Sequence, residues 1–287
     1  MSEQRVDAVI VGAGFAGMYA LHRLLKENFR PIVFEIGDNV GGTWYWNRYP
    51  GARCDVQSME YSYTFDDALQ QDWNWSEKYA PQPEILRYAN HVADRFKLRP
   101  HINFSTRVLS AHYQQDDQEW LVRTDKNKVY RAKFCIMGTG CLSSTNLPKF
   151  KDIDQFRGES FHTGNWPHGP VDFNSKRIGI IGTGSSAIQS IPLIAESCEH
   201  LTVFQRTANF SIPAHNRPLD KQYAASIKES YPTFRAENRQ MFAAFGSHQS
   251  RWDDSIFDVD DDTRQVRFEK KWQEGGLGFT SAFGDTG

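Results

Sequence analysis

Residues 6–17 of the chain read Val-Asp-Ala-Val-Ile-Val-Gly-Ala-Gly-Phe-Ala-Gly, a short apolar run that passes directly into a glycine-rich turn. Gly12 allows a tight bend, Gly14 allows a pyrophosphate to approach the backbone, and Gly17 allows a helix to pack closely on the strand. Apolar residues then recur at helical spacing between positions 18 and 25. The stretch predicts a buried strand, a glycine turn and a helix whose N-terminus can hold an anion.

The next apolar run completes a strand–helix–strand unit and has an acidic residue near its end. Glu35 lies at the end of the strand expected over Pro31–Ile36, where a carboxylate can accept hydrogen bonds from the hydroxyls of an adenosine ribose. We therefore expect the first unit to bind FAD through Gly12, Gly14, Gly17 and Glu35.

A second glycine turn follows the apolar run Arg177–Ile181, with alanine at the third glycine position. The strand expected over Leu201–Gln205 is followed by Arg206 instead of an acid. An acid there would repel a 2′-phosphate, whereas a guanidinium can bind one bidentately, so the second unit is predicted to prefer NADPH over NADH. The residues expected to contact this dinucleotide are Gly182, Thr183, Gly184, Ser185, Ser186, Gln189, Arg206 and Thr207. The alternative for the serine and glutamine side chains is that they face solvent.

Weaker patterns predict smaller elements around these two units. Residues 82–98 have the periodicity of an amphipathic helix. Three β-like runs, at 108–112, 120–123 and 129–135, predict a small antiparallel β-meander. Residues 141–174 are rich in Pro, Gly and Ser and predict a linker.

The expected fold class is α/β, with two dinucleotide-binding (Rossmann-like) domains, a small antiparallel β-meander and a partial helical insertion. We expect the N-terminal portion of an FAD-binding domain over 1–143. The linker and the first portion of an NADPH-binding domain follow over 144–218. A truncated helical insertion is expected over 219–287, where the chain becomes polar and helix-like.

The composition excludes several classes of function. The 33 basic and 35 acidic residues give a net charge of -2 and are scattered, so no nucleic-acid partner is expected. The four cysteines form neither a C-x-x-C pair nor a metal-ligand spacing, which argues against a redox-active dithiol and a metal site. There is no signal-peptide pattern, and no apolar run reaches about 18 residues, so we expect a cytoplasmic location and no membrane span.

Two further motifs narrow the expected function. Residues 156–167 have the pattern F-x-G-x-x-x-H-x-x-x-W-P and lie between the two glycine turns. Residues 41–55 combine G-x-W, Y-P-G and a downstream aspartate, and 138–140 form another G-x-G turn. In order and spacing, from position 6 to about 209, these motifs closely resemble the class I flavin-dependent Baeyer–Villiger monooxygenases. The related flavin-containing heteroatom monooxygenases are not expected to have Trp166-Pro167.

The resemblance implies an activity and its cofactors. In that family NADPH reduces FAD and becomes NADP+, the reduced flavin captures O₂ as a C4a-peroxyflavin, and a small-molecule ketone is converted to an ester or lactone. By the same resemblance Asp55 is the active-site aspartate that orients a catalytic arginine, while His162 and Trp166 couple nicotinamide binding to domain movement. The remaining cofactor contacts that the resemblance implies are Gly42, Thr43, Trp44, Asp55 and Val108.

Other interpretations stay open. The alternative for Asp55 is a cap of a turn, and the alternative for His162 is an ordinary hydrogen-bonding residue of a linker. Members of the family resembled are roughly twice as long, and their catalytic arginine comes from beyond the position that matches Gly287. We therefore expect a fragment that requires the missing C-terminal half. The competing functions are a flavin-containing N- or S-heteroatom monooxygenase and a non-catalytic fragment that binds FAD or NADPH.

Overall fold

The computed structural model describes residues 3–142, 144–241, 243–247, 249 and 251–285. The mixed α/β class expected from the sequence is confirmed. Residue contacts divide the chain into two compact units, and the chain crosses between them more than once. Unit 1 comprises Met1–Ala52 and Gln82–Phe173, and unit 2 comprises Arg53–Pro81 and Asn174–Gly287.

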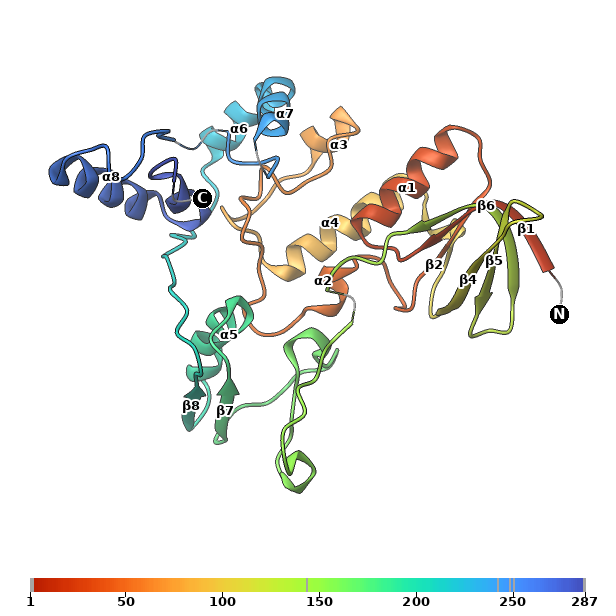
Figure 1. The fold of residues 1–287 in the computed structure, drawn as a ribbon, viewed down its shortest axis with the longest axis horizontal. Coiled ribbons are helices and arrows are strands. Elements are labelled where there is room, and N and C mark those ends of the chain that lie inside the picture. Colours follow the sequence, from red (N-terminus) through yellow and green to blue (C-terminus); the bar gives the residue numbers. More distant parts are fainter. Residues whose placement is uncertain (1–2, 143, 242, 248, 250, 286–287) are drawn as a thin grey trace. The chain divides into compact units, whose positions relative to one another are not determined.

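Unit 1 is built on a six-stranded sheet (Figure 1). Its strands are β1 (Glu3–Val11), β2 (Pro31–Phe34), β3 (Ile102–Asn103), β4 (Val108–Gln114), β5 (Glu119–Thr124) and β6 (Val129–Met137). Its helices are α1 (Phe15–Lys26), α2 (Thr43–Trp46) and α4 (Gln82–Arg95), with short 3₁₀ turns η1 (Arg99–His101), η2 (Ile153–Gln155) and η3 (Thr163–Asn165). The strand order is β3-β2-β1-β6-β5-β4, parallel from β3 to β6 and antiparallel from β6 to β4.

Strand β6 belongs to both parts of this sheet. It pairs in parallel with β1 along its length, from Val129 opposite Glu3 to Met137 opposite Val11. Its antiparallel pairing with β5 stops at Ala132. The antiparallel strands therefore continue the parallel sheet of the first strand–helix–strand unit instead of forming a second sheet.

Apolar side chains cover the parallel strands on both faces. Because alternate residues of a strand point to opposite faces, Ile10 of β1 joins a buried cluster with Leu21 of α1 and Ala89 of α4. Val9 lies in a second cluster with Tyr130 of β6. Parallel strands occur almost only where both faces are covered, and α1 and α4, side by side in Figure 1, supply one of the covers.

Close packing of backbone against backbone determines which positions of the first glycine turn must lack a side chain. Gly12 has a φ of +98°, and a Cβ on it would lie 2.7 Å from the carbonyl oxygen of Gly138. A Cβ on Gly17 would lie 1.9 Å from the carbonyl oxygen of Gly12. Without these side chains α1 can begin directly against the ends of β1 and β6. The N-terminus of α1, the positive end of the helix dipole, therefore lies at the carboxyl ends of the parallel strands.

Unit 2 contains the second strand–helix–strand unit and a group of helices (Figure 1). Strands β7 (Arg177–Ile181) and β8 (His200–Phe204) pair in parallel and are joined by α5 (Ser185–Ala195). The other elements are α3 (Asp67–Asp72), α6 (Lys221–Glu229), α7 (Tyr231–Gln240), α8 (Asp261–Glu274) and the 3₁₀ turn η4 (Gly276–Ser281).

Arg235 joins α7 to the segment Arg53–Pro81. Its side chain is buried and donates hydrogen bonds to Oε1 of Gln70 at 3.1 Å, to the carbonyl oxygen of Glu60 at 3.0 Å and to Oγ of Ser62 at 2.6 Å. A buried guanidinium is tolerated only when it is hydrogen-bonded. These contacts help to explain why the segment packs in unit 2, although unit 1 flanks it in the sequence.

Two predicted elements end earlier in the structure than the sequence indicated. Strand β2 ends at Phe34, and the side chain of the next residue, Glu35, accepts hydrogen bonds from the backbone N–H groups of Ala13 and Gly37. Helix α4 ends at Arg95, because Lys97 adopts a left-handed φ of 50°, which stops a helix. Neither difference changes the order of the elements.

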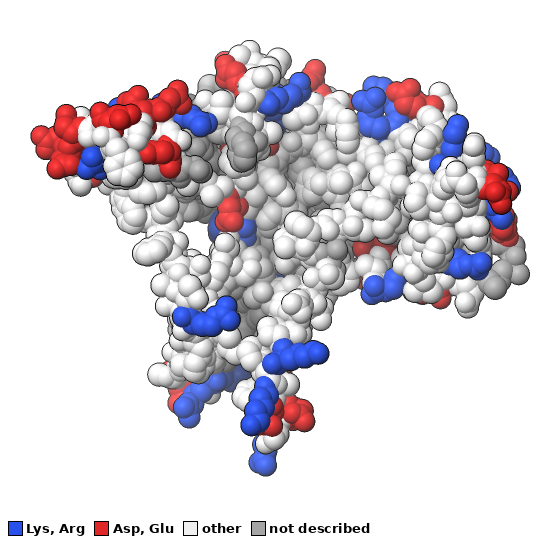
Figure 2. Space-filling model, in the orientation of Figure 1, with Lys and Arg blue, Asp and Glu red and all other residues white. Residues whose placement is uncertain are grey.

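The surface is mixed in charge. On the face drawn in Figure 2 basic and acidic side chains are intermixed, with acidic groups densest around α8. Within the described ranges no helix combines the length and the apolar character that crossing a membrane requires. The same residues form no group of three or more His, Cys, Asp or Glu side chains that would hold a metal ion.

The variant Gly17→Ala tests the close packing of the first turn. Its methyl group would meet the Gly12 carbonyl, so we expect the free energy of unfolding to fall by about 1–3 kcal/mol, as overpacking usually costs. Gly169→Ala is the control, since a Cβ there has no atom within 4 Å, and its effect should stay within about 0.5 kcal/mol. Urea unfolding followed by circular dichroism measures both. Equal stability of the two variants would contradict this account of the turn.

Candidate functional site

The carboxylate of Glu35 holds the first glycine turn. Glu35 is only 4% exposed. Its Oε2 accepts a hydrogen bond from the N–H of Ala13 at 2.7 Å, and its Oε1 accepts one from the N–H of Gly37 at 2.8 Å. Each oxygen keeps a lone pair. The residue predicted to meet a ribose therefore also closes the turn, and it retains acceptor capacity for a hydroxyl group.

A second glycine segment packs against this turn. Gly42 has a φ of +53°, and a Cβ on it would lie 2.8 Å from Cα of Gly14. Helix α2 begins immediately afterwards with Thr43 and the buried Trp44. The carbonyl oxygen of Trp44 accepts a hydrogen bond from the buried amide of Gln82 in α4. The backbones of the two segments therefore lie next to each other at Gly14 and Gly42, where neither residue has a side chain.

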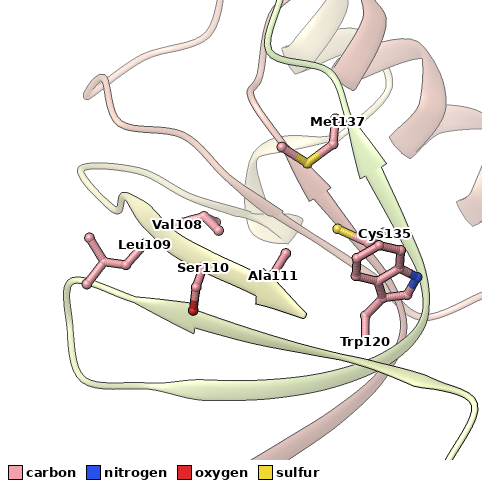
Figure 3. A pocket seen from close by; sticks show the side chains of 7 residues that line it. All are labelled: Val108, Leu109, Ser110, Ala111, Trp120, Cys135 and Met137. Carbon is pink, nitrogen blue, oxygen red and sulfur yellow. The ribbon is translucent and has the colours of Figure 1, made fainter. Parts of the chain in front are cut away.

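Val108 lies in another part of unit 1. It is the first residue of β4 and lines a surface hollow of about 370 Å³ on the antiparallel strands (Figure 3). The other residues that line it are Leu109, Ser110, Ala111, Trp120, Cys135 and Met137. Leu109 and Met137 are 63% and 61% exposed. Strands β5 and β6 separate β4 from β1 in the sheet, so Val108 is not part of the glycine turn.

The F-x-G-x-x-x-H-x-x-x-W-P stretch forms local structure within unit 1. His162 caps η3, and its Nδ1 accepts a hydrogen bond from the N–H of Gly164 at 3.1 Å. The ring of Trp166 contacts those of Phe161 and Phe173, with centroids 5.4 and 6.2 Å apart. This capping role fits an ordinary hydrogen-bonding function of His162, and the coupling role of His162 and Trp166 stays a prediction.

The end of β8 closes the second glycine turn. The N–H of Gly182, which has a φ of +106°, donates to the carbonyl oxygen of Phe204 at 2.9 Å. The hydroxyl oxygen of Thr183 accepts hydrogen bonds from Gln205 at 2.8 Å and from Asn209 at 3.2 Å. The turn and the segment that follows β8 are therefore joined by both backbone and side-chain contacts.

This second turn is open around its glycines. Gly184 is the N-cap residue of α5, whose first residues are Ser185 and Ser186. A Cβ on Gly184 would meet no atom within 4 Å, so there is space beside the helix N-terminus, where unpaired N–H groups and the helix dipole favour an anion. Arg206 and Thr207, directly after the strand-end contacts, are both exposed. The position of Arg206 suits binding of a phosphate near this turn.

Asp55 belongs to unit 2 and contacts α5. Its Oδ1 accepts a hydrogen bond from Nε2 of Gln189 at 3.2 Å. The residue is exposed at the surface, but the surrounding protein desolvates its carboxylate and raises the pKa of Asp55, while the hydrogen bond from Gln189 opposes that rise. The adjacent Cys54 is buried, and burial raises the pKa of its thiol to about 12. A thiol with that pKa is protonated at neutral pH and unreactive.

The structure places most of the predicted residues in two groups. The group in unit 1 contains Gly12, Gly14, Gly17, Glu35, Gly42, Thr43 and Trp44. The group in unit 2 contains Asp55, Gly182, Thr183, Gly184, Ser185, Ser186, Gln189, Arg206 and Thr207. Sequence reasoning missed Gln82, which supports Trp44, and the contact between Asp55 and Gln189. Neither contact follows from a periodic pattern, although a polar residue at the start of an amphipathic helix was a weak signal for Gln82.

Comparisons with known proteins identify relatives of this chain. The family model described as FMO-like, flavin-binding monooxygenase-like, matches residues 4–227. A Baeyer–Villiger monooxygenase of Pseudooceanicola batsensis is 44% identical over 97% of this chain and 50% of its own length. A cyclohexanone 1,2-monooxygenase of Acinetobacter sp is 40% identical over 96% of this chain and 50% of its own length.

The fold is also similar to that of a solved monooxygenase structure. An oxidized steroid monooxygenase bound to NADP superposes with a TM-score of 0.92 at 50% sequence identity, over 98% of this chain and 54% of its own. The chain thus spans about half the length of the relatives that it matches.

The variant Glu35→Gln tests the hydrogen bonds at the first turn. Its amide group would replace one acceptor oxygen and leave a buried backbone N–H unpaired. We expect unfolding free energy to drop by about 1–3 kcal/mol, measured by urea unfolding with tryptophan fluorescence. Glu27→Gln is the matched control, because the Glu27 carboxylate forms a long, exposed ion pair with Arg23 at 3.7 Å. A loss no larger than that of the control would show that Glu35 does not hold the turn.

Proposed function

The chain belongs to the flavin-binding monooxygenase-like family, and from that membership we propose that it forms the FAD- and NADPH-binding part of a Baeyer–Villiger monooxygenase. The enzyme would convert ketones to esters or lactones with O₂ and NADPH. The observation that carries the proposal is the pair of glycine turns, one followed by buried Glu35 and the other by exposed Arg206. The identity of 44% to a Baeyer–Villiger monooxygenase supports the same conclusion.

We assign FAD to the first group of residues. Gly14 and Gly42 approach each other so closely that no side chain stands between this backbone and a pyrophosphate. The N-terminus of α1 favours the negative charge of the phosphates. Glu35 would accept hydrogen bonds from the ribose, while Thr43 and Trp44 at the start of α2 would contact the cofactor beside the turn.

We assign NADPH to the second group. Gly182, Thr183 and Gly184 would follow the pyrophosphate, with Ser185 and Ser186 in the first turn of α5. Arg206 would bind the 2′-phosphate bidentately, because its exposed guanidinium follows the strand-end contacts with the turn. Thr207, next to it, adds a hydroxyl group. This assignment distinguishes the dinucleotides of the two units by the sign of one charge.

The chain's own residues would bind and orient the reactants. Bound FAD would supply acceptance of hydride from NADPH and activation of O₂, so that one oxygen atom enters the ketone and the other leaves as water. Asp55 would contribute an accessible carboxylate that orients a cation near the reacting groups. His162 and Trp166 would couple nicotinamide binding to movement of the domains.

We further propose that additional polypeptide is needed for turnover. Parallel strands are normally covered on both faces, yet in β7 and β8 Ile181 and Phe204 are 67% and 57% exposed. Leu109 and Met137 expose apolar surface on unit 1. Because the relatives are about twice as long as this chain, a segment equivalent to their other half is the natural cover. The domain bounds expected from the sequence stay a proposal: 1–143 for FAD, 144–218 for linker and NADPH, and 219–287 for the helical insertion. They differ from the compact units, because residues 53–81 pack in unit 2 and residues 144–173 in unit 1.

The function is tested with the FAD-loaded chain, alone and together with a polypeptide that supplies the other half of a relative. Without O₂, NADPH should bleach the flavin absorbance. With O₂ and cyclohexanone, the complemented protein should form lactone and consume one NADPH for each lactone formed.

Two results would overturn this proposal. If NADPH bleaches the flavin neither in the chain alone nor in the complemented protein, a flavin monooxygenase function is excluded. Formation of N- or S-oxides from amines or sulfides, with no lactone from ketones, would establish the heteroatom monooxygenase instead. The variant Asp55→Asn should lower lactone formation at equal flavin loading, because a neutral amide cannot orient a cation as the carboxylate would.

The dinucleotide preference is tested by Arg206→Ala. Loss of a charge-assisted contact worth about 1.5–3 kcal/mol should raise the dissociation constant for NADP+ about 10- to 150-fold and leave that for NAD+ unchanged. Isothermal titration calorimetry measures both constants without turnover. Arg239→Ala, an exposed arginine of α7, is the control and should bind both nucleotides like the unchanged protein. An unaltered preference for NADP+ in Arg206→Ala would refute the assignment.

A further inference from the structure

The side chain of Gln189 links helix α5 to the segment that contains Asp55. Its Oε1 accepts a hydrogen bond from the N–H of Arg53 at 3.3 Å, and its Nε2 donates to the carbonyl oxygen of Arg53 at 3.2 Å. The same Nε2 donates to Oδ1 of Asp55 at 3.2 Å. A carboxamide nitrogen has two protons, so the two donated hydrogen bonds use the full donor capacity of this group.

These contacts determine the orientation of the amide. The N–H of Arg53 requires an acceptor, and its carbonyl oxygen requires a donor. Oxygen must therefore face the N–H and nitrogen must face the carbonyl, which leaves the second nitrogen proton directed to Asp55. The hydrogen bond to the carboxylate is thus specified by the backbone of Arg53.

The backbone at Arg53 is held independently of Gln189. Arg53 forms an isolated antiparallel bridge with Pro81. Its guanidinium donates to Oε2 of Glu77 at 2.8 Å and to the carbonyl oxygen of Tyr79 at 2.8 Å. These contacts of the Arg53 side chain hold its backbone in place. The amide of Gln189 therefore links the backbone of Arg53 to the carboxylate of Asp55.

We propose that Gln189 is the positioning residue for Asp55, which it holds in one orientation relative to the dinucleotide-binding helix α5 and stabilises in its ionised form. The inference rests on the function proposed above for Asp55 and assigns Gln189 a role within it. An amide that donates to a carboxylate favours the charged state. The Asp55 carboxylate would then be both ionised and oriented toward its cation before the dinucleotide binds.

The other charged and titratable groups around Asp55 do not perform this task. The charge of Asp55 raises the pKa of Cys54 and of Tyr79, although burial is the larger cause for both. These groups are neutral at neutral pH. Arg53 is committed to its ion pair with Glu77. Gln189 is the group whose hydrogen bond opposes the rise in the pKa of Asp55 that burial causes.

The test is a pH titration of the Asp55 carboxyl group by ¹³C NMR in the 287-residue chain with labelled aspartate. The resonance of Asp55 is the one that Asp55→Asn removes. In Gln189→Leu the carboxylate loses its donor, so the midpoint should move to higher pH. In Gln189→Glu an acceptor for the N–H of Arg53 is retained, but a second negative charge replaces the donor, and the midpoint should be higher still.

The direction of the shift separates positioning from a purely structural role. If Gln189 only held the segment in place, its loss would expose Asp55 to water and move the midpoint down, toward the ordinary value of 3.8. Gln265→Leu is the matched control, because Gln265 also donates to a carboxylate, that of Glu269, but within α8. This variant should leave the midpoint of Asp55 unchanged.

A midpoint in Gln189→Leu that is unchanged or lower would overturn the inference. If the midpoint is unchanged and this variant also binds NADP+ more weakly, Gln189 is a ligand of the dinucleotide instead. The titration uses neither flavin nor ketone. The proposed function therefore survives if the titration fails. If the chain fails the monooxygenase test, the titration still reports whether Gln189 stabilises the Asp55 carboxylate, but the catalytic purpose of that contact is lost.

Discussion

Unit 1 depends on contact between backbone and backbone at a few glycines. A Cβ on Gly17 would lie 1.9 Å from the carbonyl oxygen of Gly12, and a Cβ on Gly42 would lie 2.8 Å from Cα of Gly14. Because those positions lack side chains, α1 starts against β1 and the second glycine segment reaches the turn. Glu35 then closes the arrangement by accepting two backbone hydrogen bonds. The same geometry that packs the unit places the glycine turn at the N-terminus of α1, where a pyrophosphate is favoured.

The two glycine turns use the same backbone device under different constraints. In unit 1 the turn is enclosed by β6, α2 and a buried carboxylate. In unit 2 a Cβ on Gly182 or Gly184 would meet no atom within 4 Å, and the strands beside the turn expose Ile181 and Phe204. An acid buried at one turn and a cation exposed near the other explain how one chain would distinguish FAD from NADPH. In the proposed assignment that distinction would be electrostatic, because an acid repels a 2′-phosphate and a guanidinium can bind one.

Local patterns predicted the elements well and the long-range contacts poorly. Strand, glycine turn and helix are encoded within a few residues, so the βαβ units around Gly12 and Gly182 were visible in the sequence. The place of strand β6 was harder to predict, because its pairing with both β1 and β5 depends on how the whole sheet assembles. The support of Trp44 by Gln82 and the packing of Arg53–Pro81 in unit 2 also depend on residues that are distant in sequence.

The sequence by itself determined the α/β class, the two glycine turns and the family, since spacing, apolar periodicity and short motifs are local properties of the chain. The tertiary structure decided which groups surround each functional side chain. Glu35 is buried and its carboxylate holds the turn by hydrogen bonds to the backbone. Asp55 accepts a hydrogen bond from Gln189, which lies 134 positions later in the sequence. No local pattern encodes such a contact. It exists only after folding has brought the helix of one nucleotide unit against a segment that the chain passes much earlier.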